Sequence, residues 1–139
     1  MTFMNKGWEA YRSRMTSLLI IAFVPLALLA TQHLASYGIV FAIAVICLGG
    51  AAHQAWSANL YTTVSDMFPK KAVGSITGIG TAAGGVGGVL IQLLAGYLDG
   101  TLSTGVAYSI MFSVCAFAYL LAWSLMKLLV PKFKLITDL

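Results

Sequence analysis

The chain has 139 residues, a net charge of +4 and a mean hydropathy of +0.91. Charged residues make up 9% of the chain, against about a quarter in soluble domains. That is too little charge to cover a globular surface. The few Lys and Arg residues lie at the ends of apolar runs and form no basic face, which argues against nucleic acid as a partner. The composition predicts an all-α membrane protein with the lipid bilayer as its main partner.

Four runs are apolar enough to cross a bilayer, which takes about 20 residues in a helix. Pro25 is expected to kink the first run. The short connections predict antiparallel neighbours within one transmembrane region, residues 1–139. The expected helices are residues 16–31, 37–64, 71–98 and 104–130.

The positive charges predict the orientation of these helices. Four spans place all eight cations on one side of the membrane: Lys6, Arg12, Arg14, Lys70, Lys71, Lys127, Lys132 and Lys134. Since positive charge marks the cytoplasmic side, both termini are expected in the cytoplasm, with the chain in a bacterial inner membrane.

The turn between the second and third runs contains Asp66 and Pro69. Proline suits the first turn of a helix, where its missing N–H is harmless. Asp66 is expected either to cap that helix or to be a solvated turn residue.

Polar side chains are concentrated in the second run, at residues 53–63. Such groups are costly in lipid without partners, so they indicate a cavity or a packed interior. At about 100° per residue, one arc of about 100° contains His53, Gln54, Ser57 and Tyr61, with Gly50 beside them. A second stripe contains Trp56, Asn59 and Thr63.

This polar helix suits a polyhydroxylated solute that is uncharged or weakly acidic. Gln, Asn, Ser and Tyr supply donors and acceptors, and Trp56 offers a flat face for a sugar ring. The alternative is that the same side chains hold helices together by hydrogen bonds. His53 alone is more typical of a structural histidine than of a proton carrier.

The third run is rich in glycine at a spacing of four residues, which lets helix backbones touch in lipid. The candidate helix-packing residues are Gly74, Gly78, Gly80, Gly84 and Gly88. A phosphate-binding loop is the weaker alternative, since no Gly-Lys-Ser/Thr follows the glycines.

No catalytic constellation is present. The acids Glu9, Asp66, Asp99 and Asp138 all lie outside the apolar cores, and Cys47 and Cys115 have no further ligand at metal spacing. We therefore expect no enzyme activity, no metal and no cofactor.

The run from Ala52 to Gly80 resembles the tenth and eleventh helices of major facilitator superfamily transporters, and most closely the hexuronate transporters of the anion:cation symporter branch. The resemblance implies that the four runs are helices nine to twelve, with the tenth lining the central cavity and the eleventh at the interface between halves. It implies proton-coupled uptake of a sugar acid. It also implies that the solute meets residues of the tenth and eleventh helices: His53, Gln54, Trp56, Ser57, Asn59, Tyr61 and, as a weaker candidate, Thr81.

Members of that family have twelve helices, and the resemblance places their carboxylate-binding arginine and proton-coupling acids in the first eight. It therefore implies a fragment that needs those N-terminal helices as partners. Two alternatives are a self-contained exporter resembling the small multidrug family, although the first run has no embedded acid, and a structural assembly subunit.

Overall fold

The computed structural model describes residues 10–131 of the chain, and Lys6, Glu9, Lys132, Lys134 and Asp138 lie outside this range. The elements in chain order are α1 (Ala10–Phe23), the 3-10 helix η2 (Val24–Ala30), α2 (Thr31–Ala35), α3 (Ile39–Met67), α4 (Lys70–Thr101) and α5 (Thr104–Leu129). Four helical stretches are long and apolar enough to cross a membrane: Tyr11–Ala35, Ile39–Met67, Lys70–Thr101 and Thr104–Leu129. The predicted all-α membrane fold with four spans is confirmed.

The first span changes its winding at Pro25, where the sequence predicted a kink. Pro25 lies in the first turn of η2, and the chain tightens from an α-helix into a 3-10 helix there before it returns to an α-helix in α2. Proline causes this change because it has no N–H for the α-helical ladder and its ring crowds the preceding turn.

The turns that reverse the chain are short and well defined. Gly38, which precedes α3, has φ of 149°, a left-handed conformation that favours glycine. Pro69 is the N-cap of α4, and no side chain caps that helix. Asp66 lies in the last turn of α3, so the expectation that it caps the next helix is wrong. The polar residues after Thr63 had suggested a turn, but the helix continues through them.

A compact core joins α1, α3 and α5. Leu18 and Ala22 of α1 are fully buried in it, together with Met15 and with Trp56 of α3. The indole N–H of Trp123 on α5 donates to the Met15 carbonyl at 2.9 Å. Three helices distant in sequence thus pack together through apolar side chains, and a part-buried hydrogen bond joins α5 to α1.

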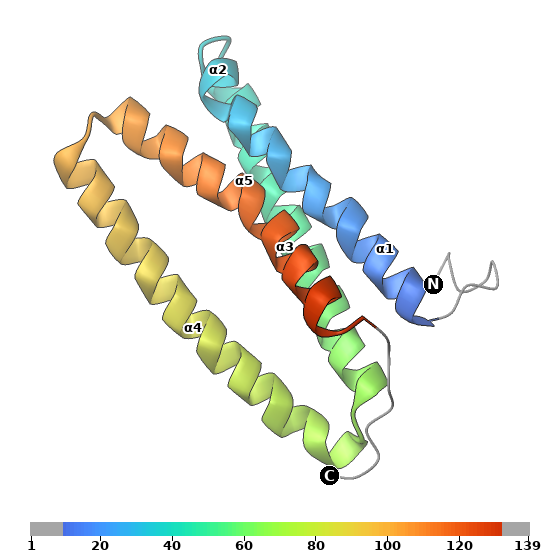
Figure 1. Cartoon of the computed structure of the whole chain (residues 1–139). Helices are drawn as coiled ribbons and strands as arrows, with labels where there is room; N and C mark the ends of the chain where they lie inside the picture. Colours follow the sequence, from blue (N-terminus) through green and yellow to red (C-terminus); the bar gives the residue numbers. More distant parts are fainter. Residues whose placement is uncertain (1–9, 132–139) are drawn as a thin grey trace.

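The fourth long helix stands apart. Figure 1 shows α4 joined to α3 and α5 by the turns at its two ends and diverging from them in between. Leu98 is the one buried residue of this 32-residue helix. Because α4 is apolar and almost entirely exposed, its surroundings must be lipid or further protein.

Candidate solute-binding site

The polar face of α3 lies toward α4 and α5. We call His53, Gln54, Ser57 and Tyr61 the α3 polar stripe. Tyr61 is 45% exposed, and its hydroxyl is 3.4 Å from the hydroxyl of Thr81 on α4. His53 contacts α5. The single arc predicted from the helical period is therefore present, and its two ends are directed at different neighbouring helices.

His53 is fixed by an unpredicted partner, Tyr119 of α5. The imidazole Nδ1 and the Tyr119 hydroxyl are 2.8 Å apart, and the two rings meet edge to face with centroids 6.3 Å apart. Tyr119 also meets Trp56 edge to face at 5.3 Å. One nitrogen of His53 is thus occupied by Tyr119, which leaves Nε2 for another ligand.

Gln54 and Ser57 differ from the threonines of the same helix. Thr62 and Thr63 donate to the carbonyls four residues before them, at 2.6 and 2.8 Å, so the helix itself satisfies these hydroxyls. Within residues 10–131, the side chains of Gln54 and Ser57 have no hydrogen-bond partner. Unpaired polar groups on a membrane-spanning helix are suited to bind a solute or an adjoining helix.

The second stripe of α3 faces the core instead. Trp56 is 7% exposed and packs among Met15, Leu18 and Tyr119. Asn59 is half-buried and donates to the Ala55 carbonyl at 2.9 Å. Trp56 thus holds helices together, whereas Asn59 bonds within its own helix. A sugar-stacking role for Trp56 requires the core to open.

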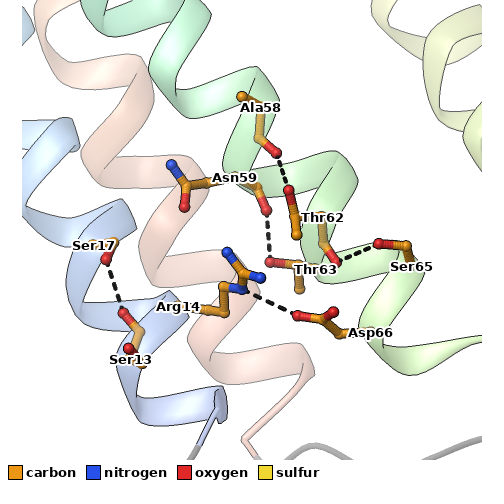
Figure 2. Close-up of polar contacts among 9 residues, drawn as sticks. All are labelled: Ser13, Arg14, Ser17, Ala58, Asn59, Thr62, Thr63, Ser65 and Asp66. Carbon is orange, nitrogen blue, oxygen red and sulfur yellow. Dashed lines mark hydrogen bonds and ion pairs between the residues drawn. The ribbon is translucent and has the colours of Figure 1, made fainter. Parts of the chain in front are cut away.

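An ion pair joins the start of α1 to the last turn of α3. Figure 2 shows the Arg14 guanidinium directed at Asp66, and Nε of Arg14 lies 3.1 Å from Oδ2 of the carboxylate. The pair is partly exposed, with side-chain exposures of 22% and 34%. Sequence analysis did not predict this pair, because its members are 52 residues apart.

The glycines of α4 lie against open space. A methyl group added at Gly74, Gly78, Gly80, Gly84 or Gly88 would meet no atom within 4 Å. The close approach occurs at Gly49 of α3 instead, where an added Cβ would lie 3.1 Å from Cδ2 of Leu28. The predicted backbone contacts of the α4 glycines are thus not made among the described helices, and they stay a prediction for helices beyond them.

Within residues 10–131, no three His, Cys, Asp or Glu side chains gather in a way that could hold a metal ion. The α3 polar stripe contains no Asp, Glu, Lys or Arg, so the arrangement can bind a polar solute through hydrogen bonds.

Comparison with known proteins identifies the family of the chain. The model of the family described as "Sugar (and other) transporter" matches residues 13–137. The chain belongs to this family. It is a family of the major facilitator superfamily, so the resemblance of the Ala52–Gly80 run is confirmed.

Two curated relatives are similar to the chain in sequence. They are hexuronate transporters of Escherichia coli, from strain K12 and from O157:H7, each 28% identical over 86 residues. Those residues make up 62% of this chain and 20% of each relative, so the match spans about a fifth of their length. No solved structure matches.

Proposed function

We propose that these four helices take part in the uptake of a sugar acid and that the α3 polar stripe binds its hydroxyl groups. The observation that carries the proposal is the pair Gln54 and Ser57, two polar side chains without a hydrogen-bond partner among the described residues. They share an arc with His53, whose Nε2 is left available by Tyr119. Sequence similarity to hexuronate transporters supports a hydroxylated acid as the solute.

The carboxylate of such a solute needs a cation that the stripe does not offer. The described Lys and Arg residues lie on α1, at the start of α4 and at the end of α5, away from the middle of α3. We therefore place the carboxylate partner and the proton-coupling groups on helices beyond those described. The open surface of α4, with the five glycines predicted to pack against other helices, is suited to contact them.

The proposed setting is a bacterial inner membrane with both ends of the chain in the cytoplasm. Its support is the distribution of charge. Arg14 meets Asp66 at the α3–α4 end, and Lys70 and Lys71 begin α4 at the same end. The turns around Gly38 and Ser103 contain no Lys or Arg.

The test joins this chain to the first eight helices of the hexuronate transporter of E. coli K12. The chimeric protein is produced in cells that have no hexuronate transporter of their own. We expect this chimeric transporter to accumulate labelled glucuronate, and to do so with proton entry. Gln54→Ala and Ser57→Ala should each lower the apparent affinity by about threefold to tenfold, the effect of one lost hydrogen bond.

The matched control is Ser113→Ala on α5. Ser113 already donates to the Ser109 carbonyl at 2.8 Å. This control should transport like the parent. If the Gln54 and Ser57 variants also behave like the parent, the stripe does not bind the solute.

A further inference from the structure

A groove lies between α4 and α5 at the end of the molecule where these helices meet. Its volume is about 460 Å³, within the range of about 300–1,000 Å³ typical of small-molecule sites. Asp99 and Tyr108 line it near the turn, and Gly96, Met111, Phe112 and Cys115 line it further from the turn. The groove is separate from the α3 polar stripe, none of whose members lines it.

The lining changes from charged to apolar with depth. Asp99 precedes the end of α4 by two residues, and Tyr108 follows the start of α5 by four. Cys115 lies seven residues further along α5, about 10 Å deeper at 1.5 Å per residue. A ligand that fits this gradient has a polar head at the turn and an apolar chain that runs into the bilayer.

The charge of the head follows from Asp99. Within residues 10–131, this carboxylate has no hydrogen bond or ion pair, and no Lys or Arg lines the groove. His33 on α2, the described histidine at this end, is exposed, contacts Tyr37 and does not line the groove. A cationic head would therefore complement Asp99, and the exposed ring of Tyr108 beside it would add a cation–π contact.

We propose that this groove binds a membrane phospholipid with an ammonium headgroup, phosphatidylethanolamine, with its ammonium at Asp99 and Tyr108 and one acyl chain along Met111, Phe112 and Cys115. The rings of Tyr108 and Phe112 lie at a tilt of 31° with centroids 6.2 Å apart. Together they form an aromatic wall for the part of the acyl chain nearest the headgroup. Gly96 opposite leaves room for the chain, since an added Cβ there would meet nothing within 4 Å.

Native mass spectrometry of the full chain, released from micelles that contain phosphatidylethanolamine and phosphatidylglycerol with identical acyl chains, tests the headgroup. We expect the ethanolamine lipid to be retained about threefold to tenfold over the glycerol lipid, since an exposed ion pair and a cation–π contact each contribute modestly. Asp99→Asn should bring the two lipids to near-equal retention. Tyr108→Leu should lower the preference, and Tyr97→Leu, an exposed tyrosine at the same end outside the groove, should leave it unchanged.

A second measurement tests the acyl chain. A phosphatidylethanolamine with a photoactivatable acyl chain should label peptides that contain Met111 and Phe112. Gly96→Leu should abolish this labelling by filling the groove, whereas Gly85→Leu, on the same helix outside the groove, should not. Equal retention of the two lipids by the parent chain, a preference that survives Asp99→Asn, or labelling spread evenly over all helices would overturn the proposal. Equal retention is also the result expected if another helix or a second copy of the chain covers the groove.

Discussion

The three-helix core and α4 are made of similarly apolar sequence, yet they differ in what they contact. In the core, Leu18, Ala22 and Trp56 are buried by neighbours from α1, α3 and α5. In α4, a Cβ added at the glycines of helix-packing spacing would meet no neighbouring atom within 4 Å. Lipid offers no hydrophobic gain for helix association, so the core is held by close packing and a few polar contacts. We therefore predict that α4 packs through these glycines against a partner other than the remaining described helices.

The largest difference in stability is expected between matched glycine substitutions in the core and in α4. Gly49→Leu forces side-chain atoms into the Leu28 contact and should lower the free energy of unfolding by about 1–3 kcal/mol, the usual cost of overpacking. Gly84→Leu adds the same atoms to an open surface and should cost nothing, with a gain of up to about 0.5–1 kcal/mol from helix propensity. Titration with a denaturing detergent, followed by circular dichroism, measures both. Equal losses would mean that α4 is packed as closely as the core.

A smaller loss of stability is expected from a substitution in α5 where it contacts the polar face of α3. Tyr119→Phe removes the hydroxyl 2.8 Å from His53 and should cost about 1 kcal/mol, with a change in the nitrogen chemical shifts of the imidazole. Tyr97→Phe removes a hydroxyl from an exposed tyrosine of α4 and should stay within about 0.5 kcal/mol of the parent. Unchanged imidazole shifts in Tyr119→Phe would show that the pair is not formed.

The smallest effect is expected at the Arg14–Asp66 pair, which is partly exposed. A double-mutant cycle of Arg14→Gln and Asp66→Asn should give a coupling free energy of about 0.3–1 kcal/mol that falls as salt is added. The same cycle with Asp99→Asn in place of Asp66→Asn serves as the control, since Asp99 lies at the opposite end of the helices, and should give no coupling. Coupling in the control as large as in the pair would remove the evidence for a direct contact.

Much of the fold follows from the sequence because a bilayer imposes a simple rule. A helix long enough to cross it needs an apolar run, and short connections make neighbours antiparallel, so four runs gave four spans. The helix bounds were less predictable where a helix ends in polar residues. Helix α3 continues through Ser65 and Asp66, because hydropathy marks where lipid ends and the hydrogen-bonded backbone continues beyond it.

The candidate site was predictable within one helix and not between helices. The 3.6-residue period separated His53, Gln54, Ser57 and Tyr61 from the stripe that contains Trp56. It could not reveal Tyr119 as the partner of His53, because the position of α5 around α3 depends on tertiary packing. Nor could spacing distinguish Gly49, which has a close neighbour, from Gly84, which has none.

Cysteine accessibility in the chimeric transporter tests the central claim most directly. With Cys47→Ser and Cys115→Ser as background, Gln54→Cys and Ser57→Cys should react with a water-soluble thiol reagent, and glucuronate should slow the reaction. Thr63→Cys, at a position 6% exposed in the core, should react slowly with or without the solute. A faster reaction at the Thr63 position than at the Gln54 and Ser57 positions, or no protection of either stripe position by glucuronate, would show that the stripe does not bind the solute.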